Sequence, residues 1–213
     1  MENFGRKSVY EGEFNNDMKE GYGIEKFNDG TVYKGYYKNN LKHGKGELSL
    51  KKEKNISVYT GEFKEGKICG KGKFIWDNKK QYEGDWENNE ISGFGILTEN
   101  DIKHIGYFSK DKKEGYGASF YLDKKFVILG KWINDIIEGI AVIFSLNDEN
   151  NNNNINEKKI VIMKEGNVIN SNLSEEEINE IKKNNNEYIN SIKIFNEKII
   201  PEYYKGINIE EFY

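Results

Sequence analysis

The chain has 213 residues, of which 36% are hydrophobic, 32% are charged and 14% are aromatic. This polar composition excludes a thick aliphatic core, so aromatic side chains must supply much of the buried surface. The net charge of −4 matches the excess of nine acidic over five basic side chains in residues 174–213, which leaves the rest neutral on balance. A neutral chain without a basic region argues against nucleic-acid binding.

The ends and the cysteine content bear on the compartment. The N-terminal residues contain no apolar stretch resembling a secretory signal. The longest apolar stretch, IIEGIAVIF, is too short to cross a bilayer. Cys69 is the only cysteine, which excludes an intrachain disulfide and fits a reducing compartment. We therefore expect a cytoplasmic protein.

A Tyr-x-Gly-x-aromatic unit recurs through the first two thirds of the chain. Its copies begin, in chain order, at Tyr10, Tyr33, Tyr59, Tyr82, His104 and Ile128, the last two being weaker matches. A second small-residue pair follows nine positions after the first glycine in every copy, with Ala141 as its only non-glycine member. The distance within a copy is constant while the connectors vary, and this combination predicts six β-hairpins.

The turn of each hairpin follows from its symmetry. Folding each copy about its centre places two residues at the tip, and these pairs are Asn16-Asp17, Asn39-Asn40, Glu65-Gly66, Asn88-Asn89, Lys110-Asp111 and Asn134-Asp135. Asn, Asp and Gly tolerate the positive φ that two-residue hairpin turns require. The same register predicts Tyr10 opposite Gly23 and Gly12 opposite Gly21, with the tyrosine ring lying over the bare glycine backbone.

Residues 8–144 resemble the MORN repeat family. The segments that carry the resemblance are YEGEF with EGYG, YTGEFKEGKICGKG, and YEGDWENNEISGFG, whereas His104 and Ile128 depart from the pattern at the leading tyrosine. We expect a mostly β fold, an elongated single-layer antiparallel meander of about six MORN β-hairpins, with a C-terminal amphipathic α-helix. The predicted segments are 1–146 for the repeat sheet, 147–157 for an Asn-rich loop, 158–170 for a degraded terminal hairpin, and 171–213 for the helix and tail.

The helix is predicted to begin at a capping box formed by Ser174 and Glu177 and to end near Pro201. Its apolar stripe comprises Ile178, Ile181, Tyr188, Ile192, Phe195 and Ile199, with Asn185 in the one polar slot. Two locations for this stripe stay open, the chain's own sheet or another chain. Docking on the own sheet is favoured because the nearest apolar face is the least costly place for burial.

No catalytic constellation is recognisable. His43 and His104 are isolated and occupy repeat positions, and Cys69 has no activating neighbour in the sequence. We therefore predict a non-catalytic protein with no cofactor and no metal site.

The predicted function is that of a scaffold or adaptor. The resemblance implies a link between membranes and cytoskeletal structures, protein partners in the form of a helix or peptide, and self-association as a homodimer. The alternative is a peripheral phosphoinositide-binding protein or a regulatory component of a phosphatidylinositol phosphate kinase pathway, with Lys51, Lys52 and Lys54 as the only basic cluster for a weak membrane contact. The candidate partner-binding residues are Tyr10, Phe14, Tyr33, Tyr37, Tyr59, Phe63, Tyr82, Trp86, Phe108, Trp132, Ile192 and Phe195.

Overall fold

The computed structural model describes residues 7–52, 55–77, 80–146 and 155–194, and these form parts of two compact units, Met1–Glu99 (unit 1) and Asn100–Tyr213 (unit 2). The strands of unit 1 are β1 (Ser8–Asn15), β2 (Met18–Phe27), β3 (Val32–Lys38), β4 (Leu41–Lys52), β5 (Asn55–Lys64), β6 (Lys67–Asp77), β7 (Lys80–Glu87) and β8 (Glu90–Glu99). Those of unit 2 are β9 (Ile102–Ser109), β10 (Lys112–Tyr121), β11 (Phe126–Ile133), β12 (Ile136–Leu146), β13 (Ile155–Lys164) and β14 (Asn167–Asn170).

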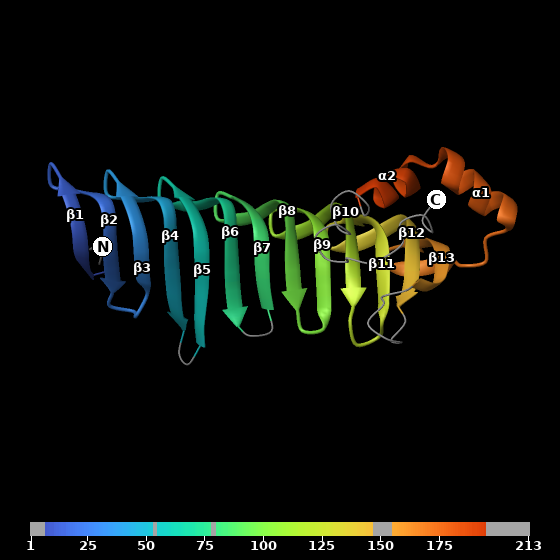
Figure 1. Cartoon of the computed structure of the whole chain (residues 1–213), viewed down its shortest axis with the longest axis horizontal. Coiled ribbons are helices and arrows are strands. Elements are labelled where there is room, and N and C mark those ends of the chain that lie inside the picture. Colours follow the sequence, from blue (N-terminus) through green and yellow to red (C-terminus); the bar gives the residue numbers. More distant parts are fainter. Residues whose placement is uncertain (1–6, 53–54, 78–79, 147–154, 195–213) are drawn as a thin grey trace, which may run out of the picture. The chain divides into compact units, whose positions relative to one another are not determined.

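Within each unit, every strand pairs antiparallel with the strand that follows it, as Figure 1 shows. The predicted antiparallel meander of hairpins is therefore confirmed. The sixth copy, which departs from the repeat at Ile128, still forms a hairpin from β11 and β12. Strands β13 and β14 form one more hairpin where a degraded one was predicted over residues 158–170.

The turns lie where the repeat predicts them. Asn16 and Asp17 have φ values of 47° and 60°, and both tip residues have positive φ at the other five tips as well. Glu165 and Gly166 repeat this geometry between β13 and β14. Positive φ at both central positions matches the right-handed twist of the flanking strands. Local turn chemistry therefore fixes the position of every hairpin.

The register beyond the turn differs from the prediction. Gly12 lies opposite Gly23, and Tyr10 lies opposite Glu25, so the predicted pairs Tyr10–Gly23 and Gly12–Gly21 are wrong. A bulge between Gly12 and Phe14 shifts the pairing, and Gly21, with φ of 68°, adopts the left-handed conformation that such a bulge favours. The prediction assumed a symmetric ladder and therefore missed the extra residues. The tyrosine ring nevertheless covers the glycines, because a Cβ on Gly23 would overlap the ring of Tyr10.

Neighbouring hairpins are joined at their tips. The backbone N–H of Lys19 donates to Asn40 Oδ1 at 2.7 Å, and the N–H of Asn40 donates back to the Lys19 carbonyl at 3.1 Å. The same exchange links Ile68 with Asn89, and Lys113 with Asp135. The Asn and Asp residues thus have two roles, since they adopt positive φ and also hold one hairpin to the next.

The C-terminal region contains two helices instead of the single helix predicted from Ser174 to Pro201. Helix α1 (Glu175–Asn184) begins at the predicted capping box, in which Ser174 and Glu177 bond to each other's backbone N–H groups. Asn185 is extended, with φ of −89° and ψ of 110°, and it interrupts the helix before α2 (Asn186–Ile194). An Asn side chain competes with helical backbone bonding, which the 3.6-residue period could not reveal.

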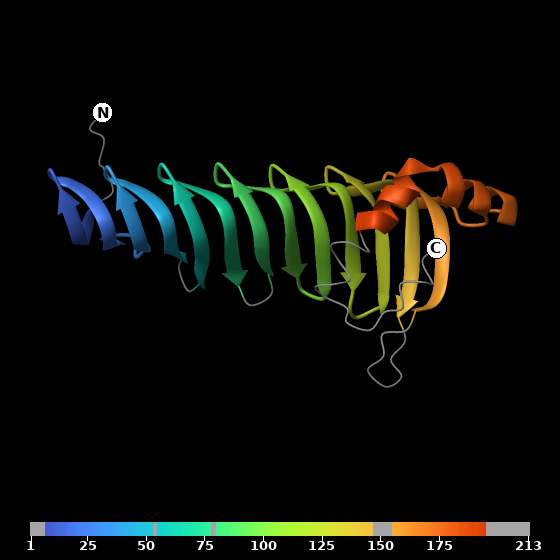
Figure 2. The ribbon, with the colours of Figure 1, turned by 45° about the horizontal axis from the view of Figure 1, so that its top comes forward.

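Helix α2 packs against β10, β11 and β12 of its own unit, as seen in Figures 1 and 2. The chain's own sheet is therefore one partner of the C-terminal region, as favoured from the sequence. Helix α1 contains no buried residue. The predicted stripe is thus divided, since Ile192 in α2 is 5% exposed whereas Ile178 and Ile181 in α1 are half-buried. Phe195 and Ile199 lie outside the described residues.

Candidate interaction surfaces

An edge-to-face ladder of rings occupies one face of the sheet, called here the aromatic face. In unit 1 the order of contacts is Phe14, Tyr10, Tyr37, Tyr33, Phe63, Tyr59, Trp86 and Tyr82, with ring centroids 5.0–5.4 Å apart and interplanar angles of 82–89°. In unit 2 His104 stands in a tyrosine position and contacts Phe108 and Trp132 in the same way. Such contacts add stability beyond the area that they bury.

Most of the predicted partner-binding residues belong to this ladder and are buried in it. Those that are 7% exposed or less are Tyr33, Tyr37, Tyr59, Phe63, Tyr82, Trp86, Phe108, Trp132 and, outside the ladder, Ile192. Tyr10 is half-buried, Phe14 is 61% exposed, and Phe195 lies outside the described residues. In the chain by itself the ladder rings pack against each other, and their use by a partner stays a prediction.

The ladder tyrosines also satisfy the backbone at the bulges. The hydroxyl of Tyr82 donates to the carbonyl of Asp85 at 3.1 Å, and Tyr10, Tyr33 and Tyr59 make the equivalent bond three residues along. Burial raises the pKa of the Tyr82 hydroxyl far above its ordinary value. These hydroxyl groups therefore act as neutral donors at any physiological pH and have no acid–base role.

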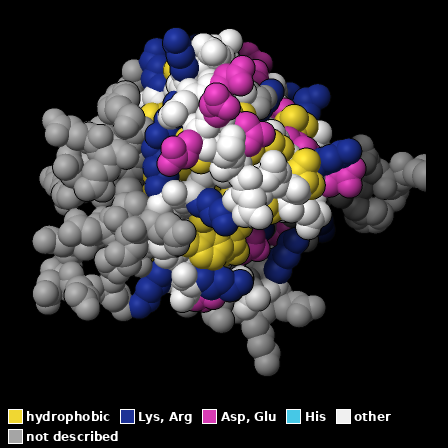
Figure 3. Space-filling model, turned by 90° about the vertical axis from the view of Figure 1, so that its right-hand side faces the viewer, with side chains coloured by type: hydrophobic (Ala, Val, Ile, Leu, Met, Phe, Trp, Pro, Cys, Tyr) yellow, Lys and Arg dark blue, Asp and Glu magenta, His cyan; other side chains and the backbone are white. Residues whose placement is uncertain are grey.

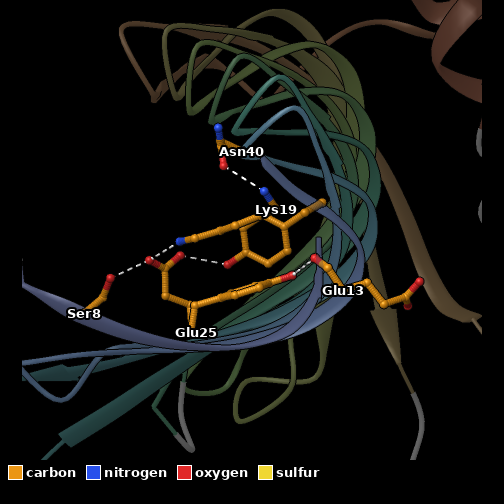
Figure 4. Close-up of polar contacts among 7 residues, drawn as sticks. Ser8, Glu13, Lys19, Glu25 and Asn40 are labelled. Carbon is orange, nitrogen blue, oxygen red and sulfur yellow. Dashed lines mark hydrogen bonds and ion pairs between the residues drawn. The ribbon is translucent and has the colours of Figure 1, made fainter. Parts of the chain in front are cut away.

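A polar cluster lies beside the first rings of the ladder, on β1, β2 and β3, and was not recognised from the sequence. Glu25 accepts hydrogen bonds from Ser8 Oγ at 2.5 Å, Lys19 Nζ at 2.5 Å and the Tyr37 hydroxyl at 2.8 Å. Burial alone would raise the pKa of Glu25, but these bonds outweigh it and hold the pKa below its usual range. Figure 4 shows Glu25, Lys19 and Asn40 inside the curve of the strands. The Glu25 carboxylate finds all three of these donors within the chain, so we assign the cluster a role in stability.

The signal for this cluster was present in the repeat alignment. Leucine or phenylalanine stands where Glu25 stands in the other unit 1 repeats, opposite the leading tyrosine, at Leu48, Phe74 and Leu97. A carboxylate at a position that is otherwise apolar requires buried partners. Comparing the repeats column by column would have shown it.

Half-buried apolar side chains accompany the ladder on the aromatic face of unit 1. They are Phe27, Leu48, Leu50, Phe74, Trp76 and Leu97. The ammonium group of Lys42 lies 5.7 Å from the Phe27 ring centroid, and that of Lys80 lies 5.6 Å from the ring centroid of Trp76. An apolar row edged by lysines is suited to an amphipathic segment of a partner.

The opposite face of unit 1 is different in kind. Cross-strand ion pairs join Lys34 to Glu47, Lys71 to Asp85 and Lys73 to Glu83, at N–O distances of 4.0, 2.6 and 3.5 Å. A shallow groove of about 590 Å³ runs through this face beside the exposed rings of Tyr22 and Tyr36. Its lysines alternate with carboxylates, so the groove does not concentrate positive charge for an anionic ligand.

The last strands and α1 of unit 2 form a third surface. Val168 and Ile169 on β14 are 48% and 60% exposed, and a hollow of about 330 Å³ is lined by Ile162, Leu173 and Ile181 together with polar residues of α1. Figure 3 faces this end and shows hydrophobic side chains between lysines and carboxylates. Its small apolar area is the kind found on many monomeric proteins.

Comparison with known families matches the MORN repeat to residues 10–32, 33–52, 59–80, 82–98 and 104–118. The chain belongs to the MORN repeat family. The fifth MORN match includes His104, and the sixth hairpin, β11 with β12, lies beyond the matched residues although it has the same turn. A comparison with curated proteins gave no match.

MORN repeats are generally non-catalytic, and the side chains singled out for chemistry have structural surroundings here. His104 is 1% exposed and bonds through Nδ1 to Ser119 Oγ at 2.8 Å. Burial raises the pKa of the Cys69 thiol, which makes it a poorer nucleophile. Among the described residues, no three acidic, His or Cys side chains converge to hold a metal, and no helix has the length and apolarity to cross a membrane.

Proposed function

We propose that this MORN-repeat protein is a non-catalytic scaffold whose unit 1 binds an amphipathic helix or peptide of a protein partner on the aromatic face. The observation that carries the proposal is the row of half-buried apolar side chains from Phe27 to Leu97 beside the buried ladder. Such a row gains by further burial, at about 25 cal/mol per Å² of apolar surface.

The ladder makes this face suitable for recognition. Its rings fix each other at right angles, so the surface above them is preorganised and a partner loses little free energy in ordering it. Lys42 and Lys80 stand beside the apolar row, and Lys80 pairs with Glu99 at 3.3 Å, so the margin of the row is polar, as the border of an amphipathic segment requires. This combination supports a protein partner in preference to a small-molecule ligand.

Phosphoinositide binding is the alternative, and no observation on the described residues favours it. Lys51 and Lys52 are exposed at the end of β4, Lys54 lies outside the described residues, and the lysines of the opposite face are paired with carboxylates. Attachment to membrane or cytoskeletal structures and homodimer formation stay predictions drawn from the resemblance, and the cytoplasmic location stays a prediction from the sequence.

The test places a photo-crosslinking phenylalanine analogue at Leu50 on the aromatic face, and separately at the exposed Thr60 on the opposite face, in the full chain. On irradiation in an extract of the source cell, we expect a discrete protein adduct from position 50 and none from position 60. The adduct should disappear with Leu48→Glu, because an unpaired charge opposes docking of an apolar segment.

Circular dichroism of Leu48→Glu is the control for folding. Equal adducts from both positions, or an adduct from position 60 alone, would contradict binding on the aromatic face.

A further inference from the structure

Strand β1 presents a sheet edge that no described strand occupies. One edge of β1 pairs with β2, and its residues are largely exposed, with Val9 at 67% and Phe14 at 61%. An unpaired row of N–H and C=O groups is a template for another strand unless the sequence blocks it. The identity of the side chains along β1 decides what can pair there.

The chain contains a paired equivalent of this edge. Strand β7 has the sequence YEGDW where β1 has YEGEF, but β7 pairs on both sides, with β6 and with β8. On the β6 side, Asp85 Oδ1 pairs with Lys71 and Glu83 pairs with Lys73. Gly72 stands between the two lysines and lies opposite Gly84. Within the chain, a strand with the sequence Lys-Gly-Lys is thus what pairs with a strand of this type.

The carboxylates of β1 are placed as those of β7. Glu13 Oε1 accepts from the Tyr22 N–H at 2.9 Å, just as Asp85 Oδ2 accepts from the Phe94 N–H at 3.0 Å. Figure 4 shows the Glu13 carboxylate pointing away from the polar cluster inside the sheet. Neither Glu11 nor Glu13 forms an ion pair with any residue that the structure describes. The two acids that β7 neutralises with Lys71 and Lys73 therefore lack that neutralisation in β1.

The ring ladder is open at the same edge. Trp86 of β7 packs between Tyr59 and Tyr82 and is 7% exposed. Its equivalent Phe14 contacts the ring of Tyr10 alone among the ring pairs of the described residues. An added strand with an apolar neighbour would extend the ladder and bury the Phe14 ring.

A second copy of β1 does not fit this edge. Glycine pairs with glycine at every strand junction of unit 1, and in that register two antiparallel β1 strands would place Glu11 of each against Glu13 of the other. Like charges directly opposite each other destabilise a sheet pair. The chain's own Lys-Gly-Lys strand, β6, already pairs with β5 and β7.

We propose that the β1 edge binds an extended basic segment of a protein partner, in which two Lys or Arg residues flank one small residue and an apolar residue follows. The basic side chains pair with Glu13 and Glu11, the small residue lies opposite Gly12, and the apolar residue lies opposite Tyr10. Main-chain hydrogen bonds supply affinity and the alternate side chains supply specificity, as in other strand additions. This edge is separate from the aromatic face proposed above.

The probe is a fluorescently labelled synthetic peptide of residues 67–77, with Cys69→Ser, and its binding to the full chain is followed by fluorescence anisotropy. We expect saturable binding with a dissociation constant below about 1 mM, weakening as salt is raised. A matched peptide with Lys71→Glu and Lys73→Glu should bind about tenfold more weakly, the effect of two exposed ion pairs.

Charge exchange distinguishes the β1 edge from every other place where a basic peptide could bind. The chain with Glu11→Lys and Glu13→Lys should reverse the preference and bind the glutamate peptide more tightly. Glu11→Gln with Glu13→Gln is a second variant of nearly equal shape, in which discrimination between the peptides should vanish.

Hydrogen exchange should show new protection in β1 when the lysine peptide is bound. The proposal is overturned if neither peptide saturates, if discrimination is unchanged in both variants, or if the protection appears outside β1.

Discussion

The two units are built from the same type of hairpin, but their faces opposite the ladder differ in composition. In unit 1 this face carries alternating lysines and carboxylates in cross-strand pairs, with Thr60 before the glycine of the third repeat. In unit 2 the face is apolar: Ile105 on β9 is fully buried, and the side chains of β10, β11 and β12 on this face that are 2% exposed or less are Ala118, Phe120, Val127, Leu129, Val142 and Phe144. Helix α2 packs on the strands that carry them. The buried Ile192 of α2 is not a member of the apolar cluster that surrounds Trp132 on the aromatic face.

The difference shows that the repeat residues determine the composition of only one face of the sheet, the aromatic face. The ladder and the glycine row stabilise the aromatic face in unit 1 with no second layer from the described residues, so the opposite face is free to be polar. In unit 2, where His104 and Ile128 replace the leading tyrosine, apolar residues on the opposite face and a helix packed against β10, β11 and β12 accompany the change. Loss of repeat character and gain of a second layer thus occur together.

Matched truncations test this contrast and should give the largest effect. Leu129 and Thr60 both precede the glycine of the repeat unit, but Leu129 is fully buried whereas Thr60 is exposed. We expect Leu129→Ala to cost about 2–5 kcal/mol of unfolding free energy, because it leaves a cavity at a fully buried position. Thr60→Ala should change stability by less than about 0.5 kcal/mol.

Urea denaturation of the full chain, followed by circular dichroism, measures both truncations. Equal losses at the two positions would show that the opposite face contributes alike in both units.

Hairpin positions could be predicted because they depend on local chemistry. Tip residues such as Asn16 and Asp17 favour positive φ, and the constant spacing of the glycines locates each turn. The bulge at Gly21 could not be placed, since a symmetric ladder and a bulged one share the same turn and the same glycine spacing. The helix break at Asn185 was missed for a similar reason, because the apolar period continues across it.

The surfaces were less predictable than the fold. The sequence identifies the ladder rings, but whether Tyr33 or Phe14 is accessible depends on which rings are flanked on both sides, and only the assembled sheet shows this. The Glu25 cluster joins residues from β1, β2 and β3, and the pairing of Glu13 with Tyr22 depends on the bulge. Tertiary placement decides these contacts.

Alanine substitutions at two equivalent glycines test whether the leading tyrosine ring fills the space above the glycine. We expect them to have an intermediate effect on stability. A Cβ on Gly84 would lie 2.5 Å from both the Gly95 Cα and the Tyr82 hydroxyl, and neither neighbour can easily move. On Gly130 the nearest atom is Ile137 Cδ1 at 3.0 Å, the end of a flexible side chain, because Ile128 replaces the tyrosine there. We expect Gly84→Ala to cost about 1–3 kcal/mol through overpacking, and Gly130→Ala to cost less.

Thermal melts of the two variants give the ranking of the glycine substitutions. A Gly130→Ala variant that is the less stable of the two would refute the idea that a ring fills the space above Gly84.

The smallest expected effect is a pH dependence of the unfolding free energy that His104 gives to unit 2. His104 holds a ladder position that is tyrosine in every unit 1 repeat, and burial, reinforced by the nearby Lys113, holds its pKa well below the usual value. Below pH 6.5 the unfolded chain therefore binds a proton that the folded chain does not, so the free energy of unfolding falls as the pH is lowered. A single such group changes stability by at most about 1.4 kcal/mol per pH unit.

His104→Tyr should remove this contribution, because tyrosine stays neutral over the whole range, and its hydroxyl can donate to the Tyr107 carbonyl as Tyr82 donates to Asp85. Urea midpoints of the variant and the natural chain, compared between about pH 7 and pH 5.5, isolate the histidine because Glu25 and the other carboxylates are common to both. Tyr59→His is the matched change in unit 1 and should introduce the same slope, since Tyr59 is fully buried. If the natural chain and His104→Tyr keep parallel pH profiles, His104 is not held neutral in the folded chain, and the contrast between the two ladders reduces to shape alone.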